Sequence, residues 1–326
     1  MKIGLYDADG HNFPSLPLMK ISAYHKARGD FVEFAIPLVH YDKVYVSRVF
    51  GDEYTKFSDF CFNADEVIYG GTGFAIKVEN GKEVYSKSKD TNLPKEIEHI
   101  YPDYSLYPEF TKNTAYGFLT RGCPNNCSFC IVSKKEGRKC VKVANLSEFW
   151  RGQSHIKLLD ANLLACADKV DLLNQLIDSG AKVDFTQGLD ARFITADIAE
   201  LINQIKVDRV HFAFDFMKNE KAIIKGLNEF RKHCDLSDDK TIVYMLTNYD
   251  TTINEDLYRI NAIRNAGFIP DVRIYRKSTA PKVLRDLQRW CNNRYIFRSC
   301  DFMDYIPRSD GKTIKQLYFN KGEYNV

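Results

Sequence analysis

The feature that most constrains the fold is a regular alternation of apolar, strand-length segments with longer amphipathic segments between residues 115 and 291. Short apolar runs bounded by turn residues predict strands, and apolar residues repeated at helical spacing predict helices. Strands that alternate with helices favour parallel pairing within one sheet. The expected strands are Ala115–Thr120, His155–Asp160, Lys182–Thr186, Arg209–Phe214, Thr241–Leu246 and Val272–Tyr275.

The helices expected between and after these strands are Ala167–Ser179, Ala196–Ile205, Glu220–Cys234, Asn254–Ala266 and Pro281–Cys291. Thr195, Asn219 and Thr279 are suited to cap helix N-termini. Gly180 and Gly267 stand where helices should end. The six strands predict a partial parallel (β/α)6 barrel of the α/β class, because a complete barrel of this type has eight strands. A doubly wound sheet is the alternative fold.

A smaller α/β arrangement is expected before this array. Its elements are strands at Lys2–Tyr6, Phe31–Ile36, Lys43–Ser47 and Glu66–Tyr69, a helix at Leu16–Arg28, and a hairpin of Phe74–Val78 and Lys82–Ser86 joined through Asn80-Gly81. A polar segment at Lys87–Pro94 is typical of a linker. We therefore expect a small Rossmann-like domain at residues 1–100, the partial barrel at 101–278 and a basic C-terminal extension at 279–326.

The composition, 44% hydrophobic and 27% charged, is ordinary for a globular protein in water. No apolar run approaches the roughly 18–20 residues that a membrane span needs. Asp7 interrupts the N-terminus where a signal peptide would continue its apolar core, so we expect a cytoplasmic protein with no membrane partner. In that compartment the nine cysteines are not expected to form a disulfide framework, and the net charge of +3 neither requires nor excludes nucleic acid.

Three cysteines are spaced C-x3-C-x2-C in the stretch Arg121-Gly122-Cys123-Pro124-Asn125-Asn126-Cys127-Ser128-Phe129-Cys130, directly after the first strand of the array. Pro and Asn between them are turn residues and indicate a loop. Three thiolates on one compact loop can ligate three irons of a 4Fe–4S cluster. The next cysteine, Cys140, follows only ten residues later, so one iron would stay open to another ligand. An open metal position is where substrate chemistry takes place.

This motif, after a first strand and at the start of a six-unit β/α array, resembles that of the radical S-adenosylmethionine (SAM) superfamily over about residues 115–275. The resemblance implies that Cys123, Cys127 and Cys130 hold the cluster and that SAM chelates the fourth iron. It implies that an electron from the cluster cleaves SAM and that the 5′-deoxyadenosyl radical abstracts a hydrogen atom from a substrate. Phe129 matches the aromatic position that packs near the adenine. A reducing electron donor of the flavodoxin or ferredoxin type is implied as partner.

Polar residues follow the later strands, at the end where parallel β/α arrays carry their active sites. Asp160 and Asn162 follow the second strand, in the place of the superfamily's Gly-Gly-Glu-like motif, which holds the SAM amino group. Further candidate SAM contacts are Gln187, Asp190 and Arg192 after the third strand and Asn248 after the fifth. Arginine can bind a carboxylate with two parallel hydrogen bonds. The alternatives are a helix cap or turn for Asp190 and a surface ion pair for Arg192.

Other uses of the cysteines stay open. A structural zinc site would need a fourth ligand at finger spacing, which the loop lacks. The protein could also be an iron–sulfur module with a binding or regulatory role and no catalysis. The sequence assigns no role to Cys61, Cys140, Cys166, Cys234, Cys291 and Cys300, and their spacing does not favour an auxiliary cluster.

The N-terminal part partly resembles a cobalamin-binding domain. Asp9-Gly10-His11 follows the first strand, Ser47 follows a later one, and Gly70-Gly71 follows the last. In that family the histidine coordinates cobalt, and the glycines let the nucleotide tail approach the backbone. Pro14 stands where the family has glycine, so we predict a domain that keeps the fold without binding cobalamin. Bound cobalamin would instead favour radical methyl transfer.

Residues 271–298 are rich in basic side chains, with aromatic residues among them. The positive charges are Arg273, Arg276, Lys277, Lys282, Arg285, Arg289, Arg294 and Arg298, with Trp290, Tyr295 and Phe297 among them. Such a surface suits a nucleotide or another anionic substrate. A solvated helix face is the alternative.

Overall fold

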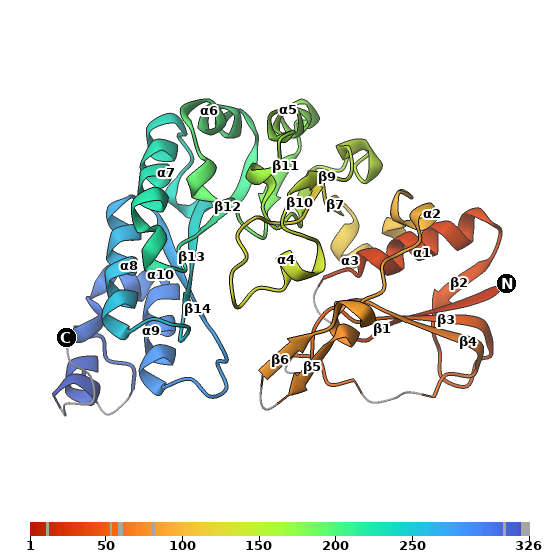
Figure 1. Cartoon of the computed structure of the whole chain (residues 1–326), viewed down its shortest axis with the longest axis horizontal. Helices are drawn as coiled ribbons and strands as arrows, with labels where there is room; N and C mark the ends of the chain where they lie inside the picture. Colours follow the sequence, from red (N-terminus) through yellow and green to blue (C-terminus); the bar gives the residue numbers. More distant parts are fainter. Residues whose placement is uncertain (11–12, 53, 58–60, 80–81, 309–310, 321–326) are drawn as a thin grey trace. The chain divides into compact units, whose positions relative to one another are not determined.

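The structure is a computed structural model of the whole chain, and it describes all residues except 11–12, 53, 58–60, 80–81, 309–310 and 321–326. The chain divides into two compact units, Met1–Lys182 and Val183–Val326. We call them the first and the second unit. Figure 1 labels the helices and strands along the chain. The boundary expected near residue 100 lies inside the first unit, and the three-part domain organisation stays a prediction.

A parallel four-stranded sheet lies at the start of the first unit, as the sequence predicts. Its order is β2 (Phe31–Phe34), β1 (Lys2–Asp7), β3 (Tyr41–Ser47) and β4 (Ala64–Gly70). Apolar side chains of β1 pack with those of helix α1 (Leu16–Ala27) because both elements turn their apolar residues inward; Ile3, Leu5, Leu18 and Ile21 form this core. Gly29, at φ +80°, follows the helix at a left-handed position that glycine adopts most readily.

Strands β5 (Ile76–Glu79) and β6 (Lys82–Tyr85) form the expected antiparallel hairpin. Its proposed turn, Asn80-Gly81, lies outside the described residues. A short helix, η1 (Thr72–Ala75), precedes this hairpin. Four short helices follow it and lead to the second sheet: η2 (Lys87–Lys89), α2 (Lys95–Glu98), η3 (Tyr104–Leu106) and α3 (Pro108–Thr111).

The second sheet has six strands, and they follow one another in chain order. The strands are β7 (Thr114–Gly117), β10 (His155–Leu158), β11 (Lys182–Phe185), β12 (Val207–Ala213), β13 (Thr241–Thr247) and β14 (Ile269–Ile274). The pairings of β7 with β10, β11 with β12, β12 with β13 and β13 with β14 are parallel. The α/β class is therefore confirmed. A doubly wound sheet requires a reversal of strand order, which this sequential order lacks.

All the helices expected in this region are present within a few residues. They are α5 (Lys169–Ser179), α6 (Ala196–Gln204), α7 (Glu220–His233), α8 (Ile253–Asn265) and α9 (Lys282–Asn292). After α9 come α10 (Arg294–Ser299), η9 (Phe302–Asp304) and a π-helical turn at Lys315–Phe319. In the second unit the helices pack on their strands through apolar residues, as in the edge-to-face contact of Phe212 on β12 with Phe230 on α7, at 5.0 Å between ring centroids.

The helix ends confirm some sequence predictions and correct others. The Thr195 side chain caps α6 by accepting from the Ile198 N–H, and Gly180 ends α5 in the left-handed conformation. Thr279 does not cap α9, which begins only after Pro281. The reason is that a proline disfavours helical backbone at the residue before it. Asn219 precedes α7 without a capping side-chain hydrogen bond.

Two strand boundaries differ from the sequence prediction for physical reasons. The expected strand Ala115–Thr120 divides into β7 and a short β8 (Thr120–Arg121), which pairs antiparallel with β9 (Val141–Lys142). At Gly117 a side-chain Cβ would lie 2.3 Å from the Phe149 ring, so this aromatic packs directly on the backbone where β7 ends. Strand β14 includes Pro270, which a strand at the edge of a sheet tolerates.

Within the described part of the chain, no helix is both long enough and apolar enough to cross a membrane.

Candidate functional site

The cysteine motif lies in the first unit, on a loop that leaves β8 and returns to β9, with the short helix α4 (Val132–Lys135) on its return path. Gly122 adopts φ +91°, and a Cβ there would lie 2.2 Å from the Lys139 carbonyl oxygen. One residue later the Cys123 N–H donates to the Gly137 carbonyl at 3.1 Å. The two ends of the loop therefore touch directly, which requires glycine at position 122.

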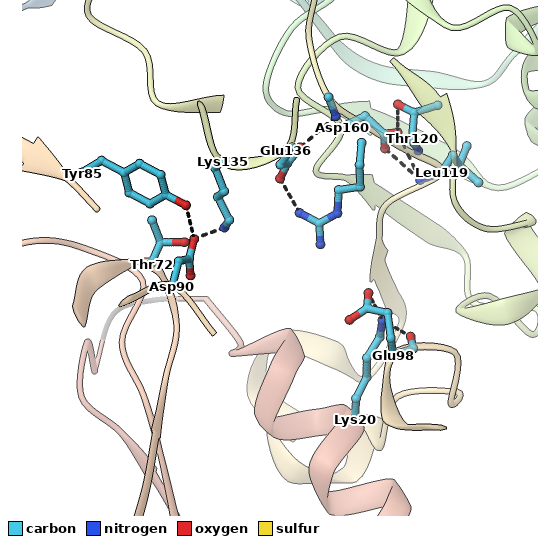
Figure 2. Close-up of polar contacts among 12 residues, drawn as sticks. Lys20, Thr72, Tyr85, Asp90, Glu98, Leu119, Thr120, Lys135, Glu136 and Asp160 are labelled. Carbon is cyan, nitrogen blue, oxygen red and sulfur yellow. Dashed lines mark hydrogen bonds and ion pairs between the residues drawn. The ribbon is translucent and has the colours of Figure 1, made fainter. Parts of the chain in front are cut away.

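Glu136 closes the base of the loop, as Figure 2 shows. One carboxylate oxygen accepts from Arg121 Nη1 at 2.8 Å, and the other accepts from the Gly122 N–H at 3.0 Å. The Arg121 guanidinium also lies 3.3 Å from the centroid of the Phe118 ring. These contacts hold the two residues that precede Cys123 and neutralise the arginine charge locally.

The three thiols of the motif, those of Cys123, Cys127 and Cys130, are partly exposed and are not joined in disulfides. The Cys130 N–H donates to the Cys127 carbonyl at 3.0 Å, so the last two cysteines belong to one tight turn. Phe129, within this turn, is also partly exposed. In the described residues no group of three or more His, Cys, Asp and Glu side chains is arranged to hold a metal ion, and cluster binding stays a prediction.

Asp160 lies at the end of β10 and is buried, with its carboxylate turned toward the segment that precedes the loop (Figure 2). It accepts from the backbone N–H groups of Leu119 and Thr120 and from the Thr120 hydroxyl. Burial raises the pKa of Asp160 to about 6, while these hydrogen bonds act in the opposite direction. They also explain why β7 stops early: both N–H groups donate to Asp160. A contact from Asp160 to the SAM amino group stays a prediction.

Asn162 follows two residues later and reaches the cysteine motif. Its side-chain Nδ2 lies 3.6 Å from the Cys123 sulfur. Its carbonyl oxygen accepts from the Cys140 thiol at 3.2 Å and from the Ala165 N–H at 3.2 Å. Burial raises the pKa of Cys140 to about 12, so this thiol stays protonated. The structure therefore brings together one predicted metal ligand, Cys123, and one predicted cofactor contact, Asn162.

The other candidate SAM contacts lie in the second unit. Asp190 accepts from the Arg192 N–H at 3.2 Å and forms a two-point ion pair with its guanidinium, at 2.8 Å to Nε and 2.7 Å to Nη2. Both alternatives from the sequence, a turn cap for Asp190 and an ion pair for Arg192, are thus present. Gln187 is exposed. Asn248, at φ +61°, donates to the Tyr275 carbonyl at 2.8 Å and joins the ends of β13 and β14. The contacts of these residues with SAM stay predictions.

A buried ion pair beneath two strand ends was not found from the sequence. Arg259 on α8 is fully buried and pairs with Asp256, whose pKa is raised by burial. Its guanidinium donates to the carbonyls of Phe214, Asp215 and Leu246, at the ends of β12 and β13. In the sequence this pair has the spacing of an ordinary surface pair on a helix, so no local pattern indicates that it is buried.

Three of the residues that resemble a cobalamin site, Asp9, Ser47 and Gly71, make contacts with other parts of this chain. Asp9 accepts from the N–H groups of Val49 and Phe50 and from the Thr55 hydroxyl. A Cβ at Gly71 would lie 2.2 Å from the Arg48 carbonyl oxygen, so this glycine serves a close approach of the chain to itself. Ser47 is buried and accepts from the Ser15 hydroxyl at 3.0 Å. His11, the proposed cobalt ligand, lies outside the described residues.

Several C-terminal basic residues have partners nearby. Arg273 pairs with Asp271 at 2.8 Å, and Arg294 pairs with Asp239 at 2.6 Å. Arg285 donates to the carbonyls of Ser278 and Ala280. These contacts fit the alternative of a solvated helix face, and an anionic substrate stays a prediction for this surface.

We compared the chain with models of known protein families and with the sequences of curated proteins, and neither comparison gave a match.

Proposed function

We propose that this protein is a radical SAM enzyme, which cleaves SAM reductively and abstracts a hydrogen atom from its substrate through a 5′-deoxyadenosyl radical. The observation that carries the proposal is the C-x3-C-x2-C loop, whose three thiols are partly exposed and form no disulfide. The loop follows the first strand of a six-stranded sheet whose strands run in chain order. We propose for this sheet the partial (β/α)6 barrel, an arrangement that sequential strand order supports.

The donor set fits a 4Fe–4S cluster. Three thiolates leave one iron available for SAM, and such a cluster supplies the electron for the reductive cleavage. Cys123, Cys127 and Cys130 would hold it. The chain's own contribution is to fix the loop: Glu136 and Gly122 close its base, and Asp160 holds the preceding segment.

The roles proposed for SAM contacts follow from side-chain chemistry. Phe129 offers an aromatic face for the adenine. Asp160 and Asn162 are proposed on the first unit. On the second unit we propose Gln187, Asp190, Arg192 and Asn248. Arg192 would contact the SAM carboxylate through its guanidinium, which has five N–H donors, two of which donate to Asp190.

The proposed partners are a flavodoxin- or ferredoxin-type electron donor and a nucleotide or other anionic substrate, in the cytoplasm. Cobalamin-dependent methyl transfer is disfavoured, because the Asp9 carboxylate and Gly71 are used in contacts within the chain. An iron–sulfur protein without catalysis is the remaining alternative, and SAM cleavage distinguishes it from an enzyme.

The first test is cluster loading and its response to SAM. Anaerobically reconstituted protein should carry about four irons and four sulfides per chain. SAM should change the electron paramagnetic resonance (EPR) spectrum of the reduced cluster. Replacement of Cys123, Cys127 and Cys130 by Ala should abolish both signals, whereas Cys61→Ala, at an exposed cysteine elsewhere, should keep them. A full cluster spectrum in the triple variant would contradict the proposal.

A further inference from the structure

The side-chain amide of Asn162 lies beside a sulfur that the proposed function makes a metal ligand. Its Nδ2 is 3.6 Å from Cys123 Sγ, within hydrogen-bond distance for a sulfur acceptor. In the structure this sulfur belongs to a free cysteine and stands in for the thiolate that would ligate iron. A thiolate is the stronger acceptor, because a hydrogen bond to an ionised group is stronger than one to a neutral group. The contact should therefore strengthen when the cysteine is ionised.

The fold holds this amide in place. Asn162 is 2% exposed, so its side chain cannot turn freely into water. Its carbonyl accepts from the Cys140 thiol and the Ala165 N–H, which fixes the backbone at the start of η5 (Leu163–Ala165). Two residues earlier, Asp160 is bonded to the backbone of the segment leading to Cys123. The segment that follows β10 is thus joined to the segment around Cys123 by two side chains, Asp160 and Asn162.

We propose that Asn162 donates a hydrogen bond to the Cys123 thiolate of the bound cluster and thereby raises the reduction potential of that cluster. Reduction adds negative charge to the cluster and its sulfur ligands. A fixed N–H donor stabilises the more negative, reduced state more than the oxidised state, and hydrogen bonds to the sulfurs are among the factors that set cluster potentials. Asn162 is in this role a positioning residue that acts through Cys123. The inference rests on the proposed function, since it requires Cys123 to be a cluster ligand.

The test is a redox titration of the reconstituted protein without SAM, followed by EPR, with iron content measured for each sample. Asn162→Leu keeps a similar size and has no N–H, and Asn162→Ser is too short to reach the sulfur. Thr120→Val is the matched control, because it removes a hydrogen bond to Asp160 in the same buried region and keeps both partners of the Asn162–Cys123 hydrogen bond.

Both Asn162 variants should destabilise the reduced state about threefold to tenfold relative to the oxidised state. For a one-electron couple at about 59 mV per factor of ten, the potential becomes more negative by about 30–60 mV. Thr120→Val should give less than a third of that shift. Its smaller effect separates the hydrogen bond to sulfur from a general loosening of the region.

Three results would overturn the inference. The potential could stay unchanged in fully loaded Asn162 variants, or Thr120→Val could shift it equally. Loss of iron from both Asn162 variants, with normal loading of Thr120→Val, would show that Asn162 is needed for assembly rather than for the potential. Failure of the wild-type chain to assemble any cluster would instead reject the proposed function itself, and iron content separates that case from the other three.

Discussion

Asp160→Asn should separate the charge of the buried carboxyl from its hydrogen bonds. In the structure one carboxylate oxygen, Oδ1, accepts from both the Leu119 and Thr120 N–H groups and from the Thr120 hydroxyl. An asparagine oxygen in the same place can accept all three. The variant therefore keeps these three hydrogen bonds, loses the ability to ionise, and replaces Oδ2, which accepts a second hydrogen bond from the Leu119 N–H, by an amide group.

The expected magnitude follows from the pKa of Asp160, which burial raises from 3.8 to about 6. A shift of this size corresponds to about 3 kcal/mol, at about 1.4 kcal/mol per pKa unit. Because the folded pKa lies above the unfolded one, the folded chain binds more protons than the unfolded chain between these values. This contribution to stability is present at low pH and is lost as the pH rises through about 6.

The assay is urea unfolding of the reduced, unloaded chain at a series of pH values from about 4 to 7, in the wild type and Asp160→Asn. The free energy of unfolding of the wild type minus that of the variant should fall by about 2–3 kcal/mol across this range. Asp160→Ala removes the acceptor and leaves buried N–H groups without a partner, so it should lower stability at every pH, by about 1–3 kcal/mol for each such group. The reasoning would be refuted if the free energy of unfolding of the wild type, minus that of Asp160→Asn, stayed constant or increased with pH.

Further predictions concern the loop, the buried ion pair, SAM binding and cobalamin. Gly122→Ala should reduce iron loading and lower stability by about 1–3 kcal/mol, since its φ is +91° and the added Cβ meets a carbonyl oxygen; unchanged iron content would contradict this. Arg259→Met should cost about 3–5 kcal/mol in urea unfolding by leaving Asp256 buried and unpaired, and addition of Asp256→Asn should restore part of it, whereas additive losses would argue against the pair. Arg192→Ala should weaken SAM binding, measured by EPR titration, more than cluster assembly, and equal losses of both would indicate a structural role. Protein purified from cobalamin-fed cells should show no stoichiometric corrinoid absorption, and a band that weakens in His11→Ala would make methyl transfer the leading reaction.

Much of the fold could be predicted from the sequence because strand length and helical periodicity are local properties. The predicted strands and long helices occur in the expected order along the chain, and the caps at Thr195 and Gly180 act as their residue types predict. The division of the strand expected at Ala115–Thr120 could not be predicted. Its causes are the Phe149 ring and the Asp160 carboxylate, which come from segments about 30 to 40 residues away.

In the candidate site, too, local sequence patterns could be predicted and contacts between distant segments could not. Motif spacing singled out the cysteines and the residues after the strands. It did not indicate that the Asp160 carboxylate bonds to the backbone before the loop, or that Glu136 closes the loop base. The burial of Arg259 also depends on tertiary packing, because its spacing from Asp256 is common on exposed helices.

The central claim is that this chain cleaves SAM with a cluster held by three cysteines. Its most direct test is the anaerobic incubation of reconstituted protein with SAM and a strong reductant, with 5′-deoxyadenosine quantified by chromatography. We expect 5′-deoxyadenosine from the wild type and from Cys61→Ala, and none from the variant with Ala at Cys123, Cys127 and Cys130. A wild type that carries a full cluster and forms no 5′-deoxyadenosine, or a triple variant that forms as much as the wild type, would contradict the account.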